Sequence, residues 1–202
     1  MIKFKNTITP SPEQWRAIIN GTRNPMNSWE KSDSTSSYIG DNDKELMLKL
    51  VTAGSDHSKF MRMITVYVDV TAPLYWWKEY DTYKVGTVAN SCSTMHKIHD
   101  KEFTLDDFSH EHLTERSYAS LIRTINDLNY ARHKFNETKN KRYWWDMIQL
   151  LPTSYNQKRT LMLNYAVLRN IYHSRKHHKL DEWREFTRWI DALPHSDLIT
   201  IL

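Results

Sequence analysis

The clearest alternation of apolar and polar residues runs from Phe60 to Val70, where β-branched side chains recur at every second position. Alternation with a period of two is typical of a strand that buries one face. Arg62 interrupts the apolar face, and Thr71-Ala72-Pro73 ends the pattern. The sequence therefore predicts a strand over residues 60–70.

Two shorter segments ahead of this strand have helical spacing. Ser11 as N-cap and Pro12 at the first helical position predict a helix that ends at Gly21. Apolar residues three and four apart predict a second helix over residues 43–53. Residues 22–41 between them are rich in Ser, Thr, Asp and Asn and predict a long polar loop, which in a compact domain is often functional.

Helical periodicity dominates the rest of the chain. The pattern predicts a long helix that runs from Leu113 towards Asn136. It predicts a second over residues 161–172, with a cap at Thr153 or Ser154, and a third over residues 180–193. Thr104 and Asp107 predict a helical start before the first of them. Residues 74–81 are too aromatic for an exposed helix, residues 85–88 look extended or looped, and the pattern here is ambiguous. One clear strand and several helices indicate a mixed α+β fold with a helical C-terminal half.

Composition limits the class of protein. A chain of 202 residues with 40% hydrophobic residues predicts one domain over residues 1–202. It has 4 glycines and neither GxGxxG nor GxxxxGK[ST], so any nucleotide site is built without a glycine-rich phosphate loop. The single Cys92 and the lack of an apolar leader favour the cytoplasm. The sequence has no run of about 18 apolar residues, so we predict no membrane-spanning helix.

Charge adds one alternative function. The net charge of +4 suits anionic ligands but is well short of the dense Lys/Arg stripe of a duplex-binding protein. The basic run His173–Lys179 and the pairs Trp76-Trp77 and Trp144-Trp145 leave open a domain that binds single-stranded nucleic acid by stacking. Core packing is the favoured explanation of the tryptophan pairs.

Two further constellations favour ordinary readings. His173 and His177 are spaced i,i+4 as metal ligands can be, but no HExxH and no third ligand accompanies them, so we predict a cationic helix end and no metal site. Cys92 stands near His96, as in a thiol–imidazole pair, yet no G-x-S-x-G-like elbow surrounds it, which favours a non-catalytic thiol.

Several segments, taken in order, carry a family resemblance. Gly54-Ser55-Asp56-His57-Ser58 precedes the strand that ends in Ala72-Pro73, and residues 82–95 follow, where Thr82, Tyr83 and Met95 replace signature residues of an RHRxxSxNxxSxR motif. Leu151-Pro152-Thr153-Ser154-Tyr155, the pair Asn164 and Arg175, and Leu180–Arg184 come later. Over residues 44–194 this order resembles the flavin-dependent thymidylate synthases.

The resemblance implies a small central β-sheet packed with long helices, and a homotetramer with sites shared between subunits. It implies reductive methylation of dUMP, or of a related pyrimidine nucleotide, with FAD, NADPH and methylenetetrahydrofolate. The flavin carries the difficult electronic step, so the protein binds anions and polarises the uracil. The alternative is a catalytically inactive member that serves as a nucleotide-binding or interaction module.

The resemblance also implies site residues. Arg184 would be catalytic by contacting the uracil, and it would hold the nucleotide together with Ser93 and His96. The residues implied for the cofactor are His57, Lys84, Thr87, Asn90, Asn164 and Arg175. Taken alone, Ser93 is explained as a turn residue, Asn164 as a helix-face hydrogen bond and Arg184 as an exposed charge.

Overall fold

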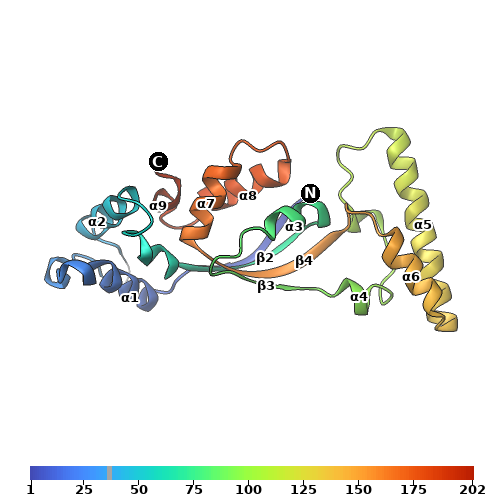
Figure 1. Cartoon of the computed structure of the whole chain (residues 1–202), viewed down its shortest axis with the longest axis horizontal. Helices are drawn as coiled ribbons and strands as arrows, with labels where there is room; N and C mark the ends of the chain where they lie inside the picture. The colour runs from blue at the N-terminus through green and yellow to red at the C-terminus, as the bar shows by residue number, and fades with distance from the viewer. Residues whose placement is uncertain (36–37) are drawn as a thin grey trace. The chain divides into compact units, whose positions relative to one another are not determined.

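The computed structural model describes residues 1–35 and 38–202; residues 36 and 37, part of the predicted 22–41 loop, lie outside the described residues. Its strands are β1 (Lys3–Ile8), β2 (Thr65–Pro73), β3 (Val88–Ser91) and β4 (Asn156–Asn164). They form a four-stranded sheet in the order β1-β2-β4-β3 (Figure 1). Helices make up most of the other regular structure, so the α+β prediction is confirmed.

The chain divides into two compact units, which we describe separately. The first comprises Met1–Lys3, Val70–Thr82 and Asn90–Arg159, and the second Phe4–Asp69, Tyr83–Ala89 and Thr160–Leu202. The single domain over residues 1–202 stays a prediction.

The first unit is built on a helical hairpin. Helices α5 (Glu115–Thr138) and α6 (Lys141–Leu150) pack side by side (Figure 1), with Thr114 as N-cap of α5 and Asn140 as N-cap of α6. The other helical segments of this unit are α3 (Leu74–Tyr80), α4 (Thr94–Lys97) and the 3-10 turn η4 (Leu105–Asp107). Its core includes Ile98, Phe103, Phe108, Leu121, Ile125, Leu128, Ala131 and Met147.

The aromatic segment after β2 is the buried helix α3. Trp76 and Trp77 are 0% and 1% exposed, so this tryptophan pair is core and offers no stacking surface. The indole nitrogen of Trp77 donates to the carbonyl of Gln157 at 2.9 Å, and the guanidinium of Arg159 lies 4.2 Å from the Trp77 ring centroid. Trp144 and Trp145 on α6 are more accessible.

The second unit contains the remaining helices. They are α1 (Pro12–Arg23), η1 (Asn24–Met26), η2 (Trp29–Lys31), α2 (Asp41–Thr52), η3 (Lys59–Arg62), α7 (Tyr165–Arg175), α8 (Asp181–Asp191) and α9 (Asp197–Thr200). Helix α7 packs against α8, α9 and η3. The largest buried side chains around it include Met61, Tyr165, Trp183 and Phe186.

Several predicted boundaries are confirmed and others are wrong. Ser11 caps α1 in a capping box with Gln14, although α1 continues past Gly21 to Arg23. The predicted strand at residue 60 begins only at Thr65, because residues 59–62 form η3 with Arg62 exposed.

The largest error concerns the segment before α7. We predict a helix from Leu161 with a cap at Thr153 or Ser154, whereas residues 156–164 form β4 and the cap is Asn164. Leu161 and Leu163 are both fully buried, which is the period of a strand. Strand β1 and helix α6 are absent from the predicted elements.

Candidate functional site

The second unit contains a cavity of about 370 Å³ beside α7. It is lined from the end of α2, from the turn that leads into η3, from α7 and by Leu202. Apolar side chains form much of the wall, namely Val51, Met61, Ala166 and Leu202. Its volume lies in the range of about 300–1,000 Å³ that is typical of small-molecule sites.

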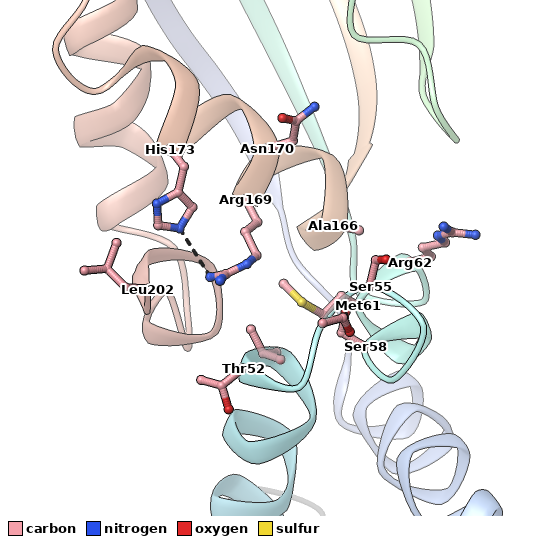
Figure 2. Close-up of a pocket in the computed structure, with 12 residues that line it drawn as sticks. Thr52, Ser55, Ser58, Met61, Arg62, Ala166, Arg169, Asn170, His173 and Leu202 are labelled. Atoms are coloured by element: carbon pink, nitrogen blue, oxygen red, sulfur yellow. Dashed lines mark hydrogen bonds between the residues drawn. The ribbon is translucent and has the colours of Figure 1, made fainter.

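Arg169 supplies the charge of this cavity. Figure 2 shows its side chain pointing into the space between Thr52, Met61 and Leu202, whereas the side chains of Arg62 and Asn170 point away. Its Nη1 donates to the carbonyl of Ile199 at 3.1 Å and also to that of Ile201. Burial lowers the pKa of Arg169, because the charged guanidinium is partly desolvated.

His173, one turn further along α7, lies against the same guanidinium. Its Nε2 is 3.2 Å from Arg169 Nη1, the contact drawn dashed in Figure 2, and 3.1 Å from the carbonyl of Ile199. Within residues 1–35 and 38–202 no group of three His, Cys, Asp or Glu could hold a metal ion. His173 therefore lies beside Arg169 and the Ile199 carbonyl at the cavity wall.

Asn164, implied as a cofactor residue, has a structural role here. It is 4% exposed, and its Oδ1 accepts from the Val167 amide at 3.0 Å as N-cap of α7. Its Nδ2 donates to the carbonyl of Gly86 at 3.0 Å. Gly86 has φ +67°, and a Cβ there would lie 2.9 Å from Asn164 Nδ2, so this position favours glycine.

Arg175, also implied for the cofactor, stacks on aromatic rings of the same unit. Its guanidinium lies 5.0 Å from the ring centroid of Trp183 and 5.7 Å from that of Tyr83, and its Nε donates to the Tyr83 hydroxyl at 2.8 Å. Tyr83 occupies the position at which the resemblance expects a histidine. The structure thus brings Arg175 of α7 into contact with Tyr83 of the segment that resembles the signature motif.

The other implied residues of this unit are at its surface. Lys84 and His57 are exposed, and His57 stands between Ser55 and Ser58, which line the cavity. Thr87 is half-buried and donates its hydroxyl to the carbonyl of Tyr83 at 3.1 Å.

Arg184, the implied catalytic residue, has a side chain that is 44% exposed on α8. It pairs with Asp181 one turn earlier and donates to the carbonyl of His178 at 3.1 Å. These contacts tie it to the start of its own helix, and the contact with a uracil stays a prediction.

Three implied residues belong to the first unit. Asn90 lies in β3, and Ser93 caps the short helix α4 by accepting from the His96 amide at 3.1 Å. All three are exposed. Their side chains are accessible to a ligand, and their implied roles stay predictions.

Cys92 is fixed by its backbone. Its amide donates to the carbonyl of Lys158 at 3.0 Å, and its own carbonyl accepts from Gln157 Nε2 at 2.9 Å. The thiol is free and exposed. No hydrogen bond in the described part of the chain joins it to an imidazole, so nothing here supports a thiol nucleophile.

Arg169 is the functional candidate that sequence reasoning missed. On the helical pattern it reads as one more exposed charge of an amphipathic helix. Its carbonyl partners lie about 30 residues further along the chain, at Ile199 and Ile201. No local motif signals such a contact, so only the fold reveals the cavity beside it.

The order of strands and the helices around them define the class of fold: it is that of the flavin-dependent thymidylate synthases. Two crystal structures of ThyX from Helicobacter pylori with FAD and dUMP match with TM-scores of 0.69 and 0.70, at 17% and 18% identity. The matches cover 98% of this chain and 96% and 97% of those chains.

A third match is the UMP/dUMP methylase PolB from Streptomyces cacaoi bound with 5-Br dUMP, with a TM-score of 0.63 at 11% identity over 99% of this chain and 94% of that chain. No protein-family model matches this sequence, and no curated protein matches it. The structural likeness therefore establishes the fold alone. No helix in the described residues is long and apolar enough to cross a membrane.

Proposed function

We propose that this protein binds FAD and a pyrimidine nucleotide and catalyses reductive methylation of dUMP, or of a related nucleotide, with NADPH and methylenetetrahydrofolate as co-substrates. The observation that carries the proposal is the structural match along nearly the whole chain to two ThyX structures with FAD and dUMP. The match to a UMP/dUMP methylase supports a pyrimidine nucleotide as substrate.

The cavity beside α7 fits the flavin part of this proposal. Its apolar wall suits an aromatic ring system, and Arg169 offers hydrogen-bond donors at one side. When bound, the flavin would supply the redox chemistry of the reaction. The protein would then bind and orient the cofactor through Arg169 and the hydroxyl groups of Ser55 and Ser58.

The nucleotide would be held by the residues that the resemblance implies. We assign Ser93 and His96 to binding the nucleotide, and Arg184 to contacting the uracil. His57, Lys84, Thr87 and Asn90 are assigned to binding the cofactor, in the absence of a glycine-rich loop. A homotetramer with sites shared between copies belongs to the same proposal, and the cytoplasmic location stays a prediction.

A specific observation favours the inactive module as second candidate. Two implied cofactor residues are engaged within the protein: Asn164 by Gly86, and Arg175 by Tyr83 and Trp183. Arginine forks are the usual binders of phosphate and carbonyl groups, so their engagement elsewhere weakens a site.

The test is a binding and turnover experiment on the full chain. The purified protein is reconstituted with FAD, its absorbance spectrum is recorded, and it is incubated with dUMP, methylenetetrahydrofolate and NADPH. Methylated nucleotide, detected by mass spectrometry and lost in Arg184→Gln but retained in Arg188→Gln, supports the enzyme. Arg188 is the matched control because it also lies on α8 and pairs with an acidic residue one turn away.

The remaining outcomes are informative in different ways. Binding of FAD and dUMP without product supports the inactive module. Failure to bind both ligands, with intact secondary structure by circular dichroism, overturns the enzyme and the nucleotide-binding module and leaves only an interaction module. Light scattering tests the assembly, and a monomer at micromolar concentration contradicts a shared site.

A further inference from the structure

The guanidinium of Arg169 has two edges, and the protein uses only one. Nη1 donates to the carbonyls of Ile199 and Ile201. Within the described residues, Nε and Nη2 have no hydrogen-bond acceptor. These two nitrogens form the side-on fork of the planar group, whose parallel N–H bonds match the two oxygens of a carboxylate or a phosphate.

The charge of Arg169 is also without an acidic partner. In the part of the chain that the structure describes, no carboxylate lies within the 4.0 Å of an ion pair from its guanidinium, whereas Arg23 pairs with Asp43 and Arg159 with Asp81. A half-buried cation with no counter-charge is unfavourable, and an anion brought by a ligand would relieve it.

We propose that the Nε–Nη2 edge of Arg169 is an oxyanion-binding fork, and that the cavity takes a ligand with a carboxylate or phosphate group on an apolar or aromatic body. The body would lie against Val51, Met61 and Leu202, and the anion on Arg169. The proposal deepens the proposed function and rests on it only in so far as the ligand is a flavin nucleotide.

The fork is fixed before any ligand arrives. The hydrogen bonds from Nη1 to the carbonyls of Ile199 and Ile201 restrict the guanidinium, and Figure 2 shows the Arg169 side chain pointing into the cavity. A preorganised donor loses little side-chain entropy on binding, so the anion contributes more to affinity. Lysine offers a single point charge in place of a fork and would only partly replace it.

A pair of dyes that differ in one anionic group tests the fork independently of flavins. The probes are 1-anilinonaphthalene-8-sulfonate and its uncharged parent, N-phenyl-1-naphthylamine, titrated by fluorescence into the full chain. We expect Arg169→Gln to weaken binding of the sulfonate about 10- to 100-fold and to leave the uncharged dye unchanged. Arg169→Lys should give an intermediate loss, and Arg188→Gln none.

Two controls locate the effect. Ala166→Trp fills the cavity, because Ala166 lines it from α7, and should abolish binding of both dyes. Equal weakening of both dyes in Arg169→Gln would mean that the substitution only loosens the segment around Ile199 and Ile201, and this would overturn the proposal. Unchanged binding of the sulfonate in Arg169→Gln would also overturn it.

A second arm identifies the source of the anion. Riboflavin lacks the phosphate of FMN, so Arg169→Gln should weaken FMN but not riboflavin if the natural ligand is a flavin nucleotide. Discrimination between the dyes without any flavin binding would keep the oxyanion fork and refute the flavin part of the proposed function. Flavin binding that is insensitive to Arg169→Gln would refute the oxyanion fork and keep the flavin part of the proposed function.

Discussion

A buried ion pair joins α1 to the start of α2 and offers the sharpest test of the second unit. The side chains of Arg23 and Asp43 are 5% and 2% exposed, and Arg23 Nε donates to Asp43. The same carboxylate accepts from the hydroxyl groups of Ser32 at 2.7 Å and of Ser34 at 2.5 Å. Asp43→Asn keeps the size of the side chain and removes its charge.

The expected cost follows from what the substitution leaves behind. Arg23 would remain buried with its counter-charge gone, and removing one partner of such a pair typically costs about 3–5 kcal/mol. Some donors of the polar loop would still find the amide oxygen, so we expect a loss of about 3 kcal/mol. This is a large part of the roughly 5–15 kcal/mol of a typical domain.

Urea unfolding followed by tryptophan fluorescence measures this loss. The matched control is Glu45→Gln, because Glu45 pairs with Lys49 on the exposed face of the same helix, and its unfolding midpoint should stay unchanged. A loss below about 1 kcal/mol in Asp43→Asn would refute the reasoning, since it would mean that the buried guanidinium finds water or another acceptor.

The same pair predicts a pH dependence. Burial raises the pKa of Asp43, but hydrogen bonds from Ser34, Ser32 and Arg23 outweigh it and hold the pKa below the ordinary 3.8. A lowered pKa in the folded state stabilises the protein above the unfolded value and loses this effect as the pH falls through the folded value. Stability should therefore decline below about pH 4 in the wild type, and less steeply in Asp43→Asn.

Two further predictions concern α7 and the buried tyrosines. Asn164→Ala removes the cap of α7 and the contact with the Gly86 carbonyl, so unfolding should cost about 2 kcal/mol less, while Asn170→Ala on the exposed side of α7 leaves the urea midpoint unchanged; equal midpoints for both variants would contradict the capping role. Burial raises the pKa of Tyr80 and Tyr165 above the ordinary 10.0, so their stabilising effect is complete below pH 10 and is lost as the pH rises further. Absorbance at 295 nm should show late-titrating phenols in the folded protein, and one titration of all tyrosines near pH 10 would exclude this.

The extent to which the fold follows from the sequence depends on whether a segment has a single period. Helix α8 and its stop at Pro194 are predicted well, because no strand pattern competes there. The residues around Leu161 satisfy two periods at once: Leu161 and Leu163 alternate, while Leu161, Tyr165 and Leu168 are spaced as in a helix. Pairing with other strands decides for β4, and this is tertiary information.

The candidate site shows the same limit. The resemblance selects polar residues by their place in motifs, but such a side chain can instead form hydrogen bonds within the protein. Asn164 is the clear case, because capping α7 and holding the Gly86 turn use both atoms of its amide. Arg169 is the converse case: it belongs to no motif, and the carbonyls of Ile199 and Ile201 make it a cavity residue.

These two kinds of residue bear differently on function. Asn164 and Arg175 contribute to the second unit through the cap and through the rings of Tyr83 and Trp183, so both have a structural role with or without a flavin. Their presence is therefore weak support for cofactor binding. The Nε–Nη2 edge of Arg169 has no acceptor within the described residues, and its guanidinium has no acidic partner there. A ligand with an anionic group would supply that partner, which makes Arg169, outside every motif, the residue that best separates ligand binding from a purely structural role.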